Sequence, residues 1–380
     1  MLGLRRAAAL AATLAATLAL APIASAGDPG RWLLSGASSV PVNYWQGLAS
    51  DPAGENVFFT GFREGLWRTT PRLLQTAGVA GAIPPEVFAA EGYNHIGDPS
   101  WDPGEGGRVL LPMECYSFSA GNTCGTGSFG VADPATLAFR YYVKLDPAEI
   151  PKAMWAETSP NGRLVWTSSG GDLLAYRSSQ ITPANRAPGG PLLRSVRRLS
   201  GAVPPSGITG AVFRRHRLLL AGSDGAADQV FSVDTRTGDR RLEIEMDICG
   251  ESEGLDTVSA LGGTLQWLIA PFDPGCQLSF GPTSALLHFT PSPGRERFDV
   301  EVTSVQAGAL PGTVEVGVRA TDQGRPVRWA RVSFAGADAR TGRDGSASVA
   351  VFLQLPGRFR AVVTRGHSYG ASALVPVGLG

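Results

Sequence analysis

The sequence has little lysine, no excess of one charge, and no long apolar run beyond its first 30 or so residues. Lysine occurs only at positions 144 and 152, and 33 basic residues balance 33 acidic ones. A balanced chain lacks the electrostatic signature of nucleic-acid binding or of binding to an anionic membrane surface. Later segments fall short of the roughly 18 apolar residues of a membrane-spanning helix. We therefore expect no nucleic-acid partner and no membrane span.

Two motifs that would reveal a reaction are also missing. The sequence contains no G-x-S-x-G nucleophile elbow. The glycine-rich segment GTGSFG (125–130) lacks the lysine and the following helix of a phosphate-binding loop. The sequence thus predicts an architecture and a candidate site more readily than a reaction.

The N-terminus has the pattern of a secretory signal peptide. Arg5 and Arg6 precede an apolar run that ends in Ala24-Ser25-Ala26, an A-x-A cleavage site. We assign residues 1–26 to the signal and expect the mature protein to be secreted and extracellular.

Four cysteines occur, at positions 115, 124, 249 and 276. An even number in an exported chain favours two disulfides, since the compartment is oxidising. The sequence-local pairings Cys115–Cys124 and Cys249–Cys276 are preferred among the three alternatives. A zinc site is a further alternative, although the spacings are not C-x-x-C.

Short strands separated by tight turns recur along residues 27–296. The 49 glycines and 28 prolines accompany a hydrophobic content of 43%, which indicates many turns rather than disorder. A strand–turn–strand–loop–strand unit recurs about every 50 residues, the spacing of propeller blades. Its third strands are represented by GLWRTTP (65–71), FGVADPAT (129–136), LLAYRSSQ (173–180), VFSVDTRTG (230–238) and LLHFTPSP (286–293).

This pattern predicts an all-β fold, a five-bladed β-propeller with six blades as the alternative. A β-sandwich or a distorted barrel would also show short strands with turns. RWLLSG (31–36) is expected to supply the outer strand of the last blade, which would close the ring and cover an edge. Residues 73–92 are the best place for a short helix or a long loop.

Residues 297–380 form a second predicted domain, because several segments alternate with period two and Asp344-Gly345 is a hairpin signal. We expect a small Ig-like sandwich of seven strands. The segments GRPVRWARVSFAG (324–336), TGRDGSASV (341–349) and LPGRFRAVVT (355–364) resemble the carboxypeptidase-regulatory-like and bacterial immunoglobulin-like modules. That resemblance implies a non-catalytic spacer or interaction module. In the propeller region, ESEGL (251–255) is similar to exported phytase-like esterase and lactonase propellers.

The predicted blades place polar residues from distant segments around one axis. The starts of the five inner strands carry Gln46, His95, Glu157, Thr209 and Glu253, and Glu114 ends the antiparallel strand beside His95. We take His95, Glu114, Glu157 and Glu253 as ligand or metal candidates, with Gln46, Asp98 and Thr209 as secondary residues of the channel.

Converging carboxylates repel unless a proton or a cation compensates them. One divalent cation, Ca²⁺ or a transition metal, suits oxygen ligands and an imidazole. A general acid–base pair and a channel filled with ordered water are the alternatives. Asp98 is a turn former in one interpretation, and Glu251 and Asp256 are expected to be solvated or to cap backbone N–H groups.

Two classes of function follow from these features. The favoured hypothesis is an exported binding or surface-interaction protein, monomeric, whose ligand is a small molecule, a glycan or a protein. The alternative is a metal-assisted hydrolase of lactone, ester or phosphoester substrates.

Overall fold

The computed structural model describes residues 32–61, 65–117, 119–204, 207–223, 227–248, 250–258, 264–270, 283–292, 294–353 and 357–378. The predicted signal peptide and the predicted pairing of residues 249 and 276 lie outside these ranges. Regular structure in the described ranges is almost entirely β. No described helix is long and apolar enough to cross a membrane.

The first three sheets are antiparallel, and in each the strands run from the inside outward in chain order. The first contains β2 (Gly47–Ser50), β3 (Val57–Thr60), β4 (Leu66–Thr69) and β5 (Gln75–Val79). The second has two short inner strands, β6 (His95–Ile96) and β7 (Ser100–Asp102), then β8 (Arg108–Glu114), β11 (Ser128–Ala132) and β12 (Phe139–Lys144). The third contains β13 (Glu157–Thr158), β14 (Leu164–Ser169), β15 (Asp172–Arg177) and β16 (Arg197–Leu199).

The last two sheets repeat this order, and the N-terminal strand completes the second of them. The fourth contains β17 (Ile208–Arg214), β18 (Arg217–Ser223), β19 (Asp228–Asp234) and β20 (Arg240–Ile248). The fifth contains β21 (Glu251–Asp256), β22 (Leu265–Ala270), β23 (Thr283–Pro291) and β1 (Trp32–Pro41). The prediction that residues near 31–36 close the ring is confirmed, because β1 pairs antiparallel with β23 along its length.

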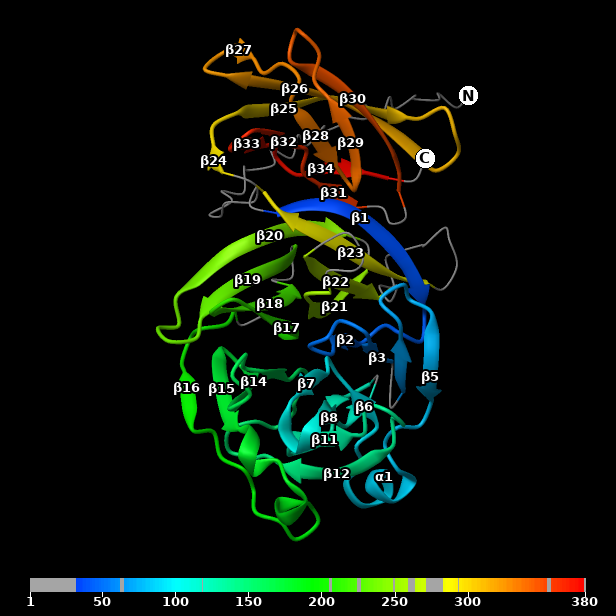
Figure 1. Ribbon diagram of the computed structural model, residues 1–380, viewed down its shortest axis with the longest axis vertical. Coiled ribbons are helices and arrows are strands. Elements are labelled where there is room, and N and C mark those ends of the chain that lie inside the picture. Colours follow the sequence, from blue (N-terminus) through cyan, green and yellow to red (C-terminus); the bar gives the residue numbers. More distant parts are fainter. Residues whose placement is uncertain are drawn as a thin grey trace, which may run out of the picture.

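The five sheets form a closed ring. The innermost strand of each contacts the innermost strand of the next, from β2 through β7, β13, β17 and β21 back to β2. The outermost strands β5, β12, β16, β20 and β1 lie around the periphery (Figure 1). The molecule is thus mostly β, with four-stranded antiparallel sheets in an arrangement consistent with a propeller.

Apolar side chains fill the space between neighbouring sheets. Trp155 and Trp166 of the third sheet pack with Leu218 and Leu220 of the fourth, and Leu48 and Phe59 of the first pack with Leu268 of the fifth. These tryptophans are therefore packing residues between neighbouring sheets. The one α-helix in the described residues, α1 (Pro85–Glu91), lies in the 73–92 segment and contributes Val87 to the core between the first two sheets.

Tight turns set the ends of the inner strands. After β13 the chain reverses through Asn161-Gly162, where Gly162 N–H donates to the Ser159 carbonyl at 2.8 Å. Gly162 has φ = 67°, a left-handed conformation that glycine adopts without strain. The turn fixes Glu157 and Thr158 at one end of the axis.

The C-terminal strands form two sheets of their own, and two further strands continue a sheet of the ring. One sheet contains β24 (Arg295–Glu296), β33 (Ser368–Ala371), β32 (Val362–Arg365), β28 (Arg331–Phe334) and β29 (Ala337–Arg340), and another contains β25 (Asp299–Ala307), β26 (Thr313–Asp322), β27 (Arg325–Pro326) and β30 (Ser346–Phe352). The remaining strands, β31 (Gly357–Phe359) and β34 (Val375–Val377), extend the fourth ring sheet beyond β20. Figure 1 shows these yellow-to-red strands beside β20, β23 and β1. Their apolar residues share a core with the fourth and fifth sheets.

Candidate functional site

Asp98 closes the axis of the ring near its middle. Its side chain is fully buried, Oδ1 accepts the Leu48 N–H at 2.8 Å, and Oδ2 accepts the Ala211 N–H at 2.9 Å. Its backbone N–H donates to the Met154 carbonyl, and its carbonyl accepts the Ala156 N–H. One residue of the second sheet thus binds the inner segments of the first, third and fourth.

Glycines surround this carboxyl group because the strands approach too closely for side chains. A Cβ on Gly47 would lie 2.3 Å from the Asp98 Cα, and a Cβ on Gly254 would lie 2.6 Å from Asp98 Oδ1. Burial raises the pKa of Asp98 well above its usual range, although the two N–H donors favour the charged form. The close contacts divide the axis into two separate cavities.

The cavity on the side where the inner strands begin is called the start-side cavity. Its volume is about 210 Å³. It is lined chiefly by Trp45, Gln46, His95, Glu114, Tyr116, Asn122, Lys152, Thr209, Glu251 and Glu253. Of the residues proposed from the sequence, Gln46, His95, Glu114, Thr209 and Glu253 meet here.

Glu253 is one of two buried acids of the start-side cavity. Its Oε1 accepts a hydrogen bond from Gln46 Nε2 at 2.9 Å, and its side chain is buried. Burial raises its pKa well above the usual range, and the nearby carboxyl groups of Glu251, Asp98 and Glu114 add to the rise. A proton or a ligand cation would relieve this accumulation of acids.

Two basic side chains, His95 and Lys152, lie beside the second buried acid of the cavity, Glu114. Glu114 Oε1 lies 2.9 Å from His95 Nδ1, and Glu114 Oε2 lies 3.7 Å from Lys152 Nζ. The His95 ring packs beside Tyr116 with ring centroids 5.4 Å apart. The start-side cavity therefore combines acids, an imidazole, an ammonium group and aromatic faces.

A disulfide and a short hairpin hold the rim of the start-side cavity. The predicted Cys115–Cys124 bridge is confirmed. It encloses the hairpin of β9 (Tyr116–Ser117) and β10 (Gly121–Asn122). Asn94 and Tyr116 add two reciprocal side-chain–backbone hydrogen bonds of 2.7 and 3.0 Å. Two cavity residues, Tyr116 and Asn122, are thereby fixed in place.

The cavity at the opposite end is called the end-side cavity. Its volume is about 530 Å³. Its polar lining comes from the first, second, third and fifth sheets, from residues further along each inner strand than the position of Asp98. These residues are Ser50, Asp51, Ser100, Glu157, Thr158, Ser159, Asp256 and Thr257. Between them lie the apolar side chains of Leu48, Val212 and Leu255.

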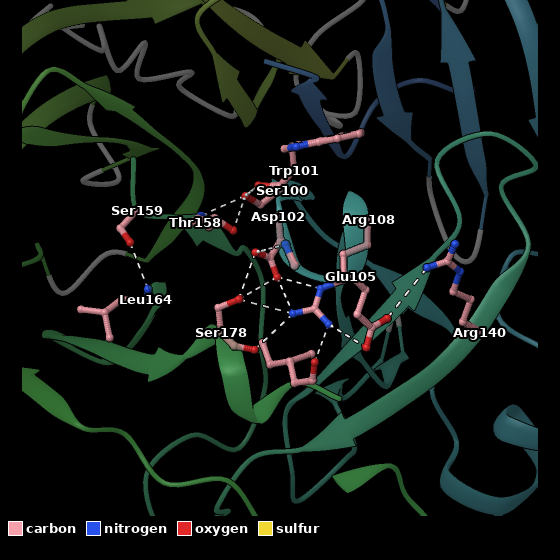
Figure 2. Close-up of polar contacts among 12 residues, drawn as sticks. Ser100, Trp101, Asp102, Glu105, Arg108, Arg140, Thr158, Ser159, Leu164 and Ser178 are labelled. Carbon is pink, nitrogen blue, oxygen red and sulfur yellow. Dashed lines mark hydrogen bonds and ion pairs between the residues drawn. The ribbon is translucent and has the colours of Figure 1, made fainter. Parts of the chain in front are cut away.

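Glu157 is held by donors from two neighbouring sheets. Oε1 accepts the Phe213 N–H at 2.8 Å, and Oε2 accepts the Ser100 hydroxyl at 3.0 Å. Figure 2 shows Ser100 beside Thr158, whose N–H donates to the Ser100 oxygen at 2.9 Å. Burial, with a contribution from Asp256, raises the pKa of Glu157 to about 8, although its side chain keeps partial contact with the cavity. Glu157 therefore keeps its proton to a higher pH than an exposed glutamate does.

Asp256 faces the same cavity with an incompletely paired carboxyl group. Oδ1 accepts the Thr257 N–H at 2.6 Å, so it does cap the backbone as expected. It is buried rather than solvated, and Oδ2 has no hydrogen-bond partner. Burial raises the pKa of Asp256 to about 6, and the nearby hydroxyl and backbone donors of Ser50 and the Thr257 N–H partly offset that rise.

The buried ion pair of Arg108 and Asp102 lies next to the end-side cavity, at the end of the strand that carries Ser100. Arg108 donates to Asp102 Oδ2 through Nε at 2.7 Å, and the Ser178 hydroxyl donates to the same carboxylate at 2.9 Å (Figure 2). The guanidinium also donates to the Tyr141 hydroxyl oxygen at 2.8 Å. These contacts join the strand that carries Ser100 to the third sheet.

The position of Glu157 departs from the predicted constellation. Asp98 lies beside Trp155 of the third sheet, and the two residues form an isolated β-bridge. Glu157 lies two residues beyond that level and so opens to the end side. Lys152 occupies the start-side position in its place. Asp98, proposed as a secondary channel residue, lines neither cavity.

Several residues of both cavities were not proposed from the sequence. Lys152 and Tyr116 had no motif to mark them. The end-side residues carried a weak signal, because the inner segments end in the polar pairs Ser50-Asp51, Glu157-Thr158 and Asp256-Thr257. Over the described ranges, no group of three or more His, Cys, Asp or Glu side chains is arranged to hold a metal ion.

Comparisons with known proteins assign no family to the chain. No family model matches the sequence, and no curated protein matches it. Among solved structures, the glutaminyl cyclase of Myxococcus xanthus is similar with a TM-score of 0.43 and 11% sequence identity, covering 70% of this chain and 99% of that chain. At this level the likeness says nothing about activity.

Proposed function

We propose that the chain is an exported binding protein whose start-side cavity takes a small organic cation. In this proposal a five-bladed β-propeller carries the site, and an Ig-like sandwich at the C-terminus braces the fourth and fifth blades. The closed ring of five inner strands supports the blade count. The signal-like N-terminus and the Cys115–Cys124 disulfide support export.

One observation carries the choice of ligand. Glu253 is a buried carboxyl group whose raised pKa reflects burial and neighbouring acids, and its one side-chain donor is the neutral amide of Gln46. An ammonium group placed against Glu253 would replace the proton and neutralise the accumulated charge. The rings of Trp45 and Tyr116 in the same wall suit the apolar part or the charge of such a ligand.

The size of the cavity favours a small molecule over a glycan chain or a protein segment. A metal-assisted hydrolase is the weaker alternative, because it requires Glu157 beside His95, Glu114 and Glu253, and Glu157 opens into the other cavity. The C-terminal region is hydrogen-bonded to β20, so we describe it as a brace rather than as a flexible spacer.

Calorimetric titration of the purified protein tests this proposal. The probes are ethanolamine, choline and putrescine, with ethylene glycol and acetate as neutral and anionic comparators. We expect saturable binding of at least one cation, strengthening as pH rises, because Glu253 must lose its proton. Glu253→Gln should weaken binding by about tenfold or more.

The matched control is Glu157→Gln, which removes a carboxyl group of raised pKa from the opposite end of the axis and should leave cation binding unchanged. Absence of binding by every cation, or equal affinity in Glu253→Gln, contradicts the proposal.

A further inference from the structure

One edge of the fourth ring sheet carries a concentration of arginines. β17 is joined to β18 through the segment 214–217, and β19 is joined to β20 through the segment 234–241. Arg217 pairs with Asp234 across β18 and β19, so the two segments lie at the same edge. We call them together the basic edge. They contain six arginines and two acids, namely Arg214, Arg215, Arg217, Arg236, Arg240 and Arg241 with Asp234 and Asp239. The balanced charge of the whole chain therefore conceals a local excess of positive charge.

Neutral groups hold several of these guanidinium groups in place. Arg214 lies over the Trp32 ring at 4.8 Å, and Arg240 lies over the Phe231 ring at 5.3 Å. Arg217 donates to one serine hydroxyl and to two backbone carbonyl oxygens at 2.8 to 2.9 Å. Such contacts orient a guanidinium group without neutralising its charge. The basic edge is therefore ordered and still able to bind an anion.

The acids of this region compensate the charge only in part. Within the basic edge, the described residues form one ion pair, in which Arg236 lies 3.7 Å from Asp234. Burial and the charge of Arg215 lower the pKa of Arg214, and the nearby acid Glu243 offsets part of that effect. An anion placed against the basic edge would relieve the repulsion between neighbouring guanidinium groups.

Arg215 occupies a backbone conformation that arginine rarely adopts. Its φ is 59°, in the left-handed region that glycine and asparagine adopt more readily in a short hairpin turn. Its side chain is exposed, so core packing does not explain an arginine at this position. The turn thus presents a cation to solvent at a conformational cost, and such costs are concentrated at functional sites.

The extent of the basic edge favours an anionic polymer over a single small anion. Four neighbouring strands, each about 4.8 Å from the next, spread the guanidinium groups over about 14 Å. A small anion contacts only part of such an array, whereas a polymer with repeated anionic groups can contact several members at once.

The other side chains of the basic edge distinguish among anionic polymers and surfaces. Both segments are fully described, and neither exposes a large apolar side chain that could insert into a lipid surface. The neighbouring aromatic rings of Trp32 and Phe231 lie beneath arginines, so they offer no open face for stacking of nucleic-acid bases. Carboxylate and sulfate groups need neither feature, because the planar guanidinium group binds their oxygens directly.

We propose that the basic edge binds an acidic polysaccharide outside the cell, with Arg215, Arg240 and Arg241 contacting its carboxylate or sulfate groups. This surface is separate from the start-side cavity, and the extracellular location of its ligand rests on the proposed export.

Microscale thermophoresis of the dye-labelled full chain tests this surface. The probes are heparin, dextran sulfate and polygalacturonate, with dextran as the neutral comparator. A short DNA duplex and vesicles that contain phosphatidylglycerol represent the other polyanions. We expect saturable binding of at least one acidic polysaccharide at about 0.05 M salt, and binding at least tenfold weaker at about 0.2 M, because the contacts displace counterions.

A double variant tests whether the basic edge carries this binding. Arg215→Gln with Arg241→Gln removes two exposed charges, so it should weaken binding about tenfold and reduce its salt dependence. The matched control is Arg343→Gln with Arg365→Gln, which removes two exposed charges from the C-terminal strands. The control should bind as the unmodified chain does, although both double variants have the same net charge.

A single variant separates the charge of Arg215 from its part in folding. In Arg215→Gly the backbone keeps a conformation that glycine adopts freely, so the thermal unfolding temperature should not fall. Affinity for the polysaccharide should nevertheless fall about threefold, because one exposed contact is lost.

The outcomes also distinguish this proposal from the one for the start-side cavity. The double variant at the basic edge should leave the calorimetric titration with small cations unchanged. The proposal fails if no acidic polysaccharide binds, or if DNA or the vesicles bind more tightly than every acidic polysaccharide. It also fails if the double variant at the basic edge binds as its matched control does.

Discussion

The two ends of the axis balance buried acids in different ways. At the start side, Lys152 and His95 stand beside Glu114, and a disulfide holds the rim. At the end side, the lining acids Glu157 and Asp256 have raised pKa values and no basic neighbour in the described lining. Basic side chains therefore lie beside an acid of the start-side cavity, whereas the described lining of the end-side cavity places none beside its acids.

This contrast depends on the close packing of Gly47 and Gly254 against Asp98, which separates the two cavities. Disrupting that packing should have the largest effect on stability. In Gly47→Ala the added methyl group would meet the Asp98 Cα at 2.3 Å, a backbone contact that cannot yield. We expect a loss of unfolding free energy on the order of 5 kcal/mol, measured by chemical denaturation.

The matched control for Gly47→Ala is Gly81→Ala. A Cβ at Gly81 meets nothing within 4 Å, and the change should stay within about 0.5 kcal/mol. Equal stability of the two variants would show that the axis is not closed at Asp98.

The second prediction concerns the support beneath the end-side cavity. Arg108→Met leaves Asp102 buried without its cation, which should cost about 3–4 kcal/mol. Arg140→Met removes a partly exposed partner of Asp133 and should cost under about 1 kcal/mol. Thermal unfolding at one pH compares them, and a loss in Arg108→Met no larger than in Arg140→Met would contradict the proposed role of the buried pair.

The sequence predicted the start side better than the end side, for a geometric reason. Turn signals locate the starts of inner strands to within a few residues, so Gln46, His95, Thr209 and Glu253 were placed correctly relative to one another. In the third sheet, an error of a few residues in the predicted start of the inner strand moved Glu157 from one cavity to the other. The error has this effect because the two cavities are separated only at the position of Asp98.

The closure of the axis by Asp98 could not be predicted from the sequence. Asp98 stands in a stretch, HIGDPS, that reads equally well as a turn. Its role depends on the depth at which Leu48 and Ala211 present their N–H groups, which is a property of the assembled ring. The overall β architecture and the closure by β1 needed only local patterns and could be predicted.

The smallest expected effect is a change in ligand affinity on substitution of Lys152. It distinguishes a start-side site for a cation from one for an anion or a zwitterion. Lys152 Nζ lies 3.7 Å from Glu114 Oε2, and its side chain is 40% exposed, so this long ion pair contributes little to stability. Its ammonium group nevertheless repels a ligand cation approaching Glu253. Lys152→Met should therefore strengthen choline or putrescine binding by about two- to fivefold, as expected for removal of one exposed charge.

Lys144→Met is the matched control for this change, because Lys144 pairs with Glu91 at 2.6 Å and lines neither cavity. It should leave the affinity unchanged in the same calorimetric titration. If Lys152→Met instead weakens binding while Lys144→Met does not, Lys152 must contact a negative group of the ligand. The start-side cavity would then select a zwitterion, with Glu253 and Lys152 at its two ends, and the contrast between the two ends of the axis would be sharper still.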